Sequence, residues 1–324
     1  MLVKVRESID DLKPYNVGGR ANLSQDWECF DWNESEFPPS NKVFEAMKTF
    51  YRYEWYPDIT ASKLKEELSK YVSLPVDFID VYNGSDDGLK DIFTVFVDKD
   101  TKVLSYPPSY TQVDTFISIN TNNYEKVQII DPLGKHQYDF THCTNADVVY
   151  LVNPNNPTGK LIDVSVIKEL VESNPDTLFV VDEAYYEFAK QSCAYLVIGN
   201  KNLIVTRTFS KAFGLAAVRL GYVIAHPDLL FHLRKIKNGK TVNALAQLCG
   251  IACLNDLDYL NARIEEMNDA KKFFIDNLPL QYTAVDSDAN FILVKTPDSV
   301  RAVSYTHLRA HETRHDLVCR LLLE

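Results

Sequence analysis

The sequence predicts an α/β protein with a mainly parallel seven-stranded sheet, helices on both faces of that sheet, and a small α+β domain beside it. Short β-rich runs alternate with helical stretches from residue 79 to about residue 240, which is the pattern of βαβ units. Several of these runs, such as 148–152 and 178–181, are continuously apolar, as expected of strands that helices cover on both faces.

The individual elements follow from local patterns. Helices are expected to begin near Ser85 and after Asp163, because both residues can cap a helix N-terminus. An amphipathic helix is expected over 63–71 and a long charged helix over 259–274, followed by a strand over 290–294. The strands of the main sheet are expected at 79–82, 102–106, 126–130, 147–152, 177–182, 202–206 and 221–225.

The chain is expected to divide into four parts. Residues 1–45 form an N-terminal arm that joins the small domain, residues 46–245 the large domain, and residues 246–300 an incomplete small C-terminal domain. Residues 301–324 contain four Arg but no Asn, Ile or Lys, three residue types that make up about a fifth of the preceding chain. We therefore predict that 301–324 is a non-native tail.

The composition excludes several classes of protein. Apolar residues make up 46% of the 324 residues, enough for a core that a disordered chain would lack. The net charge of −11 offers no basic surface for nucleic acid or for anionic membranes. No apolar run is long enough to span a membrane, no signal peptide is evident, and the six cysteines form no CxxC pair. We expect a cytoplasmic protein with reduced thiols that acts on small molecules.

Three polar motifs follow three consecutive strands of the predicted sheet. They are Asn-Pro-Asn-Asn-Pro-Thr-Gly at 153–159, Asp-Glu-Ala-Tyr at 182–185 and Thr-Phe-Ser-Lys-Ala-Phe-Gly at 208–214. Open α/β sheets bind their ligands at the carboxyl ends of the strands. The three motifs are therefore expected to meet in one site.

The residue types in these motifs suit electron withdrawal through a pyridine ring. The amine of Lys211 can form a Schiff base with an aldehyde. The carboxylate of Asp182 can face the ring nitrogen and keep it protonated, so that the ring accepts the electrons of a substrate carbanion. Asn156 and Tyr185 are expected beside the 3-oxygen of the ring. The ring of Tyr110 is expected to stack on the cofactor, with a buried core tyrosine as the alternative.

A phosphate group on the same cofactor would need backbone N–H groups at a helix N-terminus and a cationic side chain. Gly84 and Ser85 open a helix directly after the first predicted strand, so their amides can point at an anion. Ser210 and Arg219 can add a hydroxyl and a guanidinium. Asp86 lies in the same loop, where it is expected to cap the helix more than to bind the anion.

These motifs resemble those of the fold-type I pyridoxal-phosphate enzymes, and within them those of the histidinol-phosphate aminotransferases. The resemblance spans roughly residues 11–296 and includes further short motifs at 12–15, 33–34, 56–58, 84–87 and 289–291. It implies a pyridoxal 5′-phosphate cofactor, an amino donor and a 2-oxo acid as substrates, and a place in amino-acid biosynthesis, that of histidine. It also implies a homodimer with its sites at the subunit interface, to which the N-terminal arm contributes.

The resemblance further implies roles for single residues. Tyr56 would reach the cofactor phosphate of the partner subunit, and Tyr15 would approach the substrate of the partner subunit. Asn156 is also expected to contact substrate. Lys211 would carry a proton between the substrate carbon and the cofactor carbon. The arginine that binds the substrate carboxylate in the family has no counterpart in a matching motif, and none of Arg301, Arg309, Arg314 and Arg320 is assigned this role.

Two other functions remain open on the same residues. One is a decarboxylase of a phosphorylated amino acid, similar to the threonine-phosphate decarboxylases, and the other is a non-catalytic binding module that keeps the scaffold. A zinc hydrolase is disfavoured, although His311-Glu-Thr-Arg-His315 matches HExxH, because no third ligand is evident and the motif lies in the atypical tail. We expect no metal. The sequence contains no GxGxxG, the usual nicotinamide fingerprint.

Overall fold

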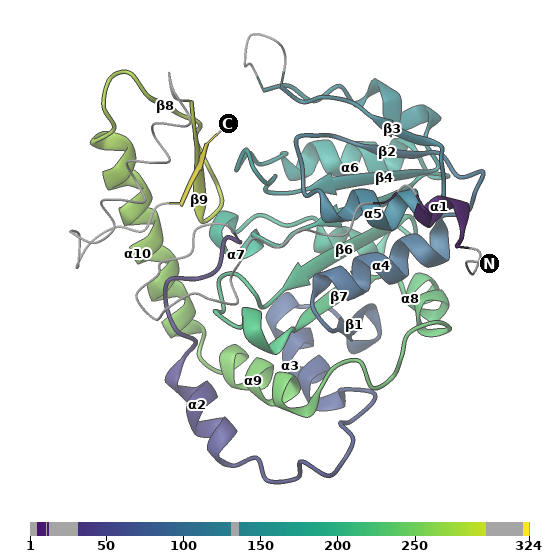
Figure 1. Ribbon diagram of the computed structural model, residues 1–324. Helices are drawn as coiled ribbons and strands as arrows, with labels where there is room; N and C mark the ends of the chain where they lie inside the picture. Colours follow the sequence, from purple (N-terminus) through teal and green to yellow (C-terminus); the bar gives the residue numbers. More distant parts are fainter. Residues whose placement is uncertain (1–4, 11, 13–31, 131–135, 296–319, 324) are drawn as a thin grey trace.

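The computed structural model describes residues 5–10, 12, 32–130, 136–295 and 320–323 (Figure 1). Its large domain is a seven-stranded sheet in the order β1-β7-β6-β5-β4-β2-β3, in which only β7 runs antiparallel to its neighbours. The predicted mainly parallel sheet is thereby confirmed. The strands are β1 (Ile79–Tyr82), β2 (Val103–Ser105), β3 (Tyr124–Lys126), β4 (Val148–Val152), β5 (Leu178–Asp182), β6 (Leu203–Thr208) and β7 (Gly221–Ala225).

The third strand is the one whose predicted position was wrong. It was expected at 126–130 but ends at Lys126, although Val127 and Ile129 still donate backbone hydrogen bonds to Ser105 and Pro107. Pro107 and Pro108, just beyond β2, have no N–H group to donate in return, so the regular ladder ends there.

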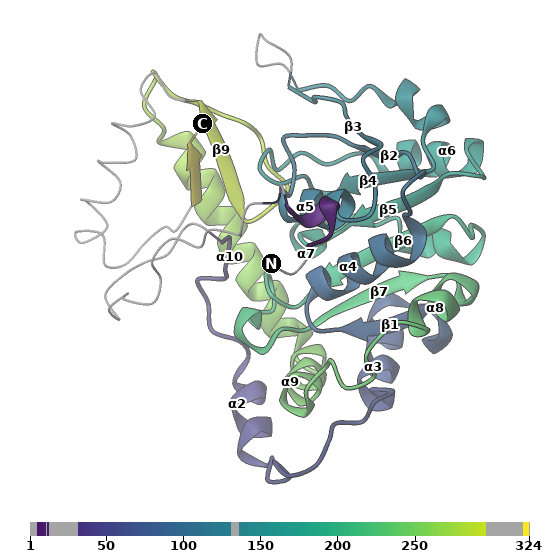
Figure 2. The ribbon, with the colours of Figure 1, turned by 45° about the vertical axis from the view of Figure 1, so that its right-hand side comes forward.

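Two apolar cores lie on the two faces of the sheet, because successive side chains of a strand point to opposite sides. One core contains Tyr150 together with buried side chains of α4 (Ser85–Phe96), α5 (Gln112–Ser118) and α8 (Pro227–Arg234). The other contains Leu151 and buried side chains of α3 (Ser62–Val72), α6 (Val164–Ser173) and α9 (Ala244–Leu254). Helices therefore cover both faces, as predicted (Figure 2).

The capping signals hold in part. The Asp163 side chain accepts a hydrogen bond from the Ser165 amide at 2.7 Å, as expected of an N-cap for α6. Helix α4 begins at Ser85 as predicted, but its N-cap is Gly84, which has no side chain to satisfy the first amides. Those amides are left to serve another partner.

The C-terminal part of the described chain contains α10 (Leu257–Asp276) and a three-stranded sheet, β10-β9-β8, which lies beside the seven-stranded sheet (Figures 1 and 2); its being a separate small domain stays a prediction. Strand β9 (Phe291–Lys295) agrees closely with the expected strand, and Lys271 of α10 donates hydrogen bonds to the carbonyls of Ser287 and Ala289 before it. β8 (Thr283–Ala284) is antiparallel to β9, and β10 (Arg320–Leu323) is parallel to it. The non-native origin of 301–324 stays a prediction.

The remaining elements are short. Within the described ranges, none of the helices combines the length and the apolar character needed to cross a membrane. The other helices are α1 (Glu7–Asp10), α2 (Asn41–Lys48), α7 (Tyr186–Ala189) and the 3₁₀ turns η2 (Val76–Phe78), η3 (Phe140–Asn145), η4 (Ala194–Ile198) and η5 (Ala216–Val218).

Candidate active site

Asp182 is the last residue of β5 and lies almost completely buried, with 3% of its surface exposed. Its Oδ2 accepts a hydrogen bond from the Tyr150 hydroxyl at 3.0 Å, and its Oδ1 accepts from the Thr206 hydroxyl at 3.1 Å and from the Ala184 amide at 3.2 Å. Burial raises the pKa of Asp182 to about 6, while the donated hydrogen bonds act in the opposite direction. The site thus holds a carboxyl group that neutral donors orient.

Lys211 lies in the turn that follows β6. Buried Phe209 and Phe213 flank it with ring centroids 4.6 Å apart, and the Leu215 amide donates to the Phe209 carbonyl at 3.0 Å. These contacts hold the turn rigidly, so that the lysine stem leaves from a fixed backbone. The Lys211 Nζ donates to the Trp32 carbonyl at 2.6 Å and lies 5.7 Å from the centre of the Tyr185 ring.

Tyr185 joins the N-terminal segment to this site. Its hydroxyl accepts a hydrogen bond from the Asn33 Nδ2 at 3.0 Å, and its ring meets Phe291 of β9 edge-on at 5.0 Å. Asn33 has a φ of 48°, a left-handed conformation that asparagine tolerates better than most residues. Its carbonyl accepts from the buried Asn290 amide at 3.4 Å. The short motifs at 33–34 and 289–291 therefore meet beside Tyr185.

The asparagines of the loop after β4 differ in their contacts. The Asn153 side chain bonds both the amide and the carbonyl of Ile162, and Asn155 donates to the Pro108 carbonyl and to Thr158. These two residues hold the loop. The half-buried Asn156 makes no side-chain hydrogen bond to any described residue, and its place beside the 3-oxygen of the cofactor stays a prediction.

An anion cradle lies at the N-terminus of α4. Gly84 has a φ of +84°, and a Cβ built there would lie 2.6 Å from the Arg219 Nη2. Glycine is thus required both by the backbone conformation and by the close approach of the guanidinium. Arg219 Nη1 donates to the Ser210 Oγ at 3.3 Å, and the Ser85 amide opens the helix beside them. Amides, a hydroxyl and a guanidinium therefore converge, as a phosphate requires.

Asp86 does not cap the helix as expected. That role falls to Asp87, whose Oδ2 accepts from the Asn83 amide at 3.2 Å, because the third residue of a helix reaches back toward the preceding turn. Asp86 instead accepts from the Tyr110 hydroxyl at 2.8 Å and lies 3.4 Å from the Arg219 Nη2. It links the expected stacking ring to the cradle.

Two predicted residues are not part of this cluster in the described chain. The Tyr56 side chain is 76% exposed, and the Lys240 Nζ lies 4.1 Å from the centre of its ring. Tyr15 lies outside the described residues, as do Arg301, Arg309, Arg314 and the motif 311–315. Arg320 is placed in β10, and its side chain is not described.

Sequence reasoning did not identify Tyr150, Thr206 or Thr208 as site residues. The Thr208 hydroxyl donates to the Ser210 Oγ at 3.0 Å within the cradle. The available signal was strand periodicity: Thr206 pairs directly with Asp182 across β5 and β6, and Tyr150 pairs with Val180, two residues before Asp182 on the same face.

The opposite face of the same strands carries a buried ion pair. Arg207 Nε donates to Glu183 Oε2 at 2.9 Å, and the two side chains are 3% and 0% exposed. Arg207 also donates to the Ser192 hydroxyl, and its guanidinium lies 3.5 Å from the centre of the Tyr186 ring. The pair ties β5 to β6 one residue beyond Asp182 and four residues before Lys211.

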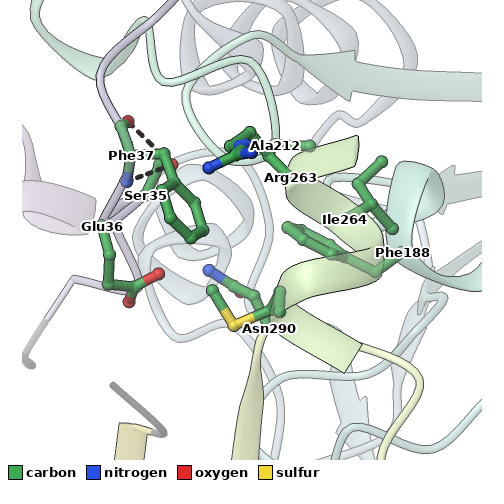
Figure 3. A pocket seen from close by; sticks show the side chains of 9 residues that line it. Ser35, Glu36, Phe37, Phe188, Ala212, Arg263, Ile264 and Asn290 are labelled. Carbon is green, nitrogen blue, oxygen red and sulfur yellow. Dashed lines mark hydrogen bonds between the residues drawn. The ribbon is translucent and has the colours of Figure 1, made fainter. Parts of the chain in front are cut away.

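A pocket lies beside the turn that carries Lys211 (Figure 3). Its arginine, Arg263 of α10, is 2.6 Å from Glu266 and 5.0 Å from the centre of the Phe37 ring. These contacts join the N-terminal segment to α10 next to the lysine turn. The lining residues are Ser35, Glu36, Phe37, Phe188, Ala212, Arg263, Ile264, Met267 and Asn290.

The donor set fits pyridoxal 5′-phosphate. The glycine at position 84 leaves room for an anion against Arg219, where a Cβ would fill the cradle. A buried carboxyl at the end of β5 suits a protonated ring nitrogen, and a lysine amine on a rigid turn suits the aldehyde. The three requirements are met by residues at the carboxyl ends of strands of the same sheet.

Comparisons with known proteins agree with this fit. The chain matches the family model described as aminotransferase class I and II over residues 25–320. A dihydroxyacetone phosphate transaminase of Campylobacter jejuni is 38% identical over 280 residues, 82% of this chain and 76% of that protein. A histidinol-phosphate aminotransferase of Clostridium beijerinckii is 30% identical over 309 residues, 94% of this chain and 86% of that protein.

Solved structures confirm the predicted fold type. The histidinol-phosphate aminotransferase of Sinorhizobium meliloti, in complex with pyridoxal-5′-phosphate, superposes with a TM-score of 0.77 at 24% identity, over 89% of this chain and 80% of that one. At this identity the likeness speaks for the fold, and the family match speaks for the enzyme class and its cofactor. The chain belongs to the class I and II aminotransferases and is an enzyme that depends on pyridoxal 5′-phosphate.

Proposed function

We propose that this aminotransferase exchanges an amino group between a small phosphorylated amine and a 2-oxo acid, with histidinol phosphate and 2-oxoglutarate as the predicted pair. The relative from Campylobacter jejuni favours a second candidate, dihydroxyacetone phosphate. The two phosphorylated compounds share one feature: the carbon that carries or receives the nitrogen is bonded to a phosphorylated hydroxymethyl group. We therefore propose this group as the common element of recognition.

The observation that supports the proposed chemistry is the placement of these groups at the carboxyl ends of strands of one sheet: Asp182 ends β5, Lys211 follows β6, and Gly84 of the cradle follows β1. The cofactor, when bound, supplies an electron-withdrawing pyridine ring. In our proposal Lys211 moves a proton at the reacting carbon, and Asp182 holds the ring nitrogen protonated. The amides of Gly84 and Ser85 bind the phosphate, and the remaining residues share the tasks of binding and orientation.

Those remaining roles are proposed as follows. The ring of Tyr110, anchored by Asp86, stacks on the pyridine, while Asn156 and Tyr185 bond its 3-oxygen. The Asn33 side-chain amide supports this role of Tyr185, because its hydrogen bond to the phenol oxygen holds the Tyr185 hydroxyl in place. Ser210 and Arg219 complete the phosphate site.

A homodimer is part of the proposal. The segment before α3 exposes several large side chains together, which is unusual for a surface that faces only water. Tyr56 belongs to this segment and would extend toward the partner's cofactor. The exposed residues, with their exposed fractions, are Tyr51 (72%), Tyr53 (73%), Trp55 (63%), Tyr56 (76%) and Ile59 (59%).

The test measures the two half-reactions separately. Protein loaded with pyridoxal phosphate is mixed, without a 2-oxo acid, with histidinol phosphate or with 2-amino-3-hydroxypropyl phosphate, the amine that corresponds to dihydroxyacetone phosphate. Ketone formation is followed by mass spectrometry, and glutamate is tested in the same way. Separation matters because no arginine in a matching motif is assigned to the 2-oxo acid, and a slow glutamate step must not hide a fast amine step.

The outcomes distinguish the candidates. Faster turnover of one amine identifies the substrate, and carbon dioxide release from threonine phosphate in place of amine transfer would favour the decarboxylase. Failure of every phosphorylated amine, with transfer from unphosphorylated amino acids, would contradict the proposed substrate class. Lys211→Ala is the matched control, and turnover equal to the parent would remove this lysine from the mechanism and leave a binding module as the alternative.

A further inference from the structure

Tyr150 is a buried tyrosine whose side chain is held in place by packing and by a hydrogen bond. It lies in the middle of β4 with 1% of its surface exposed, and its ring meets Phe93 of α4 edge-on at 5.9 Å. Its hydroxyl donates to Asp182 Oδ2 at 3.0 Å. Because the packing around the ring holds the phenol, the hydroxyl can approach the carboxylate from one direction only.

We infer that Tyr150 is a positioning residue, whose hydroxyl sets the orientation of the Asp182 carboxylate and keeps it ionised against the cofactor ring. The inference rests on the role of Asp182 proposed above and does not depend on which amine is the substrate.

The distribution of donors around Asp182 supports this role. Oδ1 accepts two hydrogen bonds, from Thr206 and from the Ala184 amide, whereas Oδ2 accepts one, from Tyr150. A carboxylate oxygen has two lone pairs, so Oδ2 keeps one for a ring nitrogen, and the Tyr150 bond decides where it points.

The second part of the argument concerns charge. Burial favours the neutral form of Asp182, and the nearby Asp86 on α4 acts in the same direction. The groups that face Asp182 and favour its anion are the hydroxyls of Tyr150 and Thr206 and the Ala184 amide, none of which is charged. A protonated Asp182 could not hold a proton on the ring nitrogen. Loss of the Tyr150 hydroxyl should therefore raise the pKa of Asp182.

The test compares Tyr150→Phe with Tyr82→Phe. Tyr82 is also fully buried, in the same core, and its hydroxyl has no hydrogen-bond partner among the described residues, so both changes delete one buried oxygen. A hydrogen bond to a charged group corresponds to roughly a ten- to hundred-fold effect. We expect Tyr150→Phe to move the acid limb of the pH–rate profile upward by about one unit, to lower kcat up to about ten-fold on that limb, and to regain activity at higher pH.

A second readout is independent of turnover. Binding of pyridoxal phosphate, titrated by fluorescence at several pH values, should weaken for Tyr150→Phe below neutral pH and return toward the parent value above it. Tyr82→Phe should match the parent in both assays. If Tyr150→Phe behaves like Tyr82→Phe, or loses the same factor at every pH, the inference is wrong.

Two further variants keep the test decisive. If Tyr150→Phe does not fold, Thr206→Val removes the donor on the other carboxylate oxygen and should shift the acid limb in the same direction; no shift would contradict the argument from donated hydrogen bonds. Asp182→Asn separates the two levels of the proposal. Parental activity in Asp182→Asn would overturn the role of Asp182 itself, whereas an impaired Asp182→Asn beside a normal Tyr150→Phe would overturn only the role of Tyr150.

Discussion

Replacement of Gly84 by alanine should weaken binding of the cofactor through its phosphate. The new Cβ would lie 2.6 Å from the Arg219 Nη2 and 3.2 Å from its Cζ, so the guanidinium must move. The backbone at Gly84, with φ +84° and ψ 163°, is a conformation that residues with a Cβ rarely adopt, and alanine there adds strain of roughly 1–3 kcal/mol. Loss of one charge-assisted hydrogen bond costs about 1.5–3 kcal/mol, which corresponds to a ten- to hundred-fold rise in the dissociation constant.

The assay is equilibrium dialysis of the cofactor-free protein against pyridoxal phosphate and, in parallel, against pyridoxal, which lacks the phosphate. We expect Gly84→Ala to lose affinity for the first ligand and to keep its affinity for the second, because in our proposal the cradle contacts only the phosphate. Gly199→Ala is the matched control, since a Cβ at Gly199 meets no atom within 4 Å. Equal losses for the two ligands, or no loss for either, would refute the assignment of the cradle.

Three further outcomes follow from the structure. Burial raises the pKa of Asp182 from 3.8 to about 6, so the protonated carboxyl contributes stability below about pH 4, and this contribution is lost as the pH rises through about 6. Between these limits, the free energy of unfolding of the cofactor-free parent, measured in urea, should fall by about 3 kcal/mol relative to that of Asp182→Asn. Parallel plots of unfolding free energy against pH for the two proteins would contradict this. Arg207→Met leaves the Glu183 carboxylate buried without its partner and should cost about 3–5 kcal/mol in the same assay, of which the double variant with Glu183→Leu should recover a large part. A charge at Trp55, introduced as Trp55→Glu, should convert a dimer to a monomer in sedimentation analysis, and an unchanged sedimentation coefficient would remove this segment from the interface.

The arrangement of strands was largely predictable because it depends on local signals. Continuous apolar runs such as Val148–Val152 identify strands covered on both faces, and the polar motifs after them mark their carboxyl ends. The boundary of β3 was not predictable in this way. It depends on Pro107 and Pro108 just beyond the neighbouring strand β2, which end the ladder from outside the segment.

The residues of the candidate site likewise divide into those that local motifs predict and those that they do not. Lys211 and Asp182 were predicted from motifs at strand ends, since Asp182 ends β5 and Lys211 lies in the turn after β6, and Arg219 was predicted from its position eight residues beyond Lys211. The hydroxyl of Tyr150 was not, since its contact with Asp182 depends on the register between β4 and β5, which no local pattern states. The capping role of Asp87 instead of Asp86 depends on which side chain reaches back over the helix end, a difference of one position.

Adjacent residues Asp182 and Glu183 show how strand geometry separates two acids. Alternation sends Asp182 to the face of α4, where it meets only neutral donors, and Glu183 to the opposite face, where Arg207 neutralises it. The charge of Glu183 is thereby used within the protein, to hold β5 against β6. The charge of Asp182 forms no ion pair with any described residue, and we propose that it serves a ligand. In our proposal the group that this carboxylate meets is a protonated ring nitrogen of the cofactor, because neutral donors orient the carboxylate without neutralising its charge.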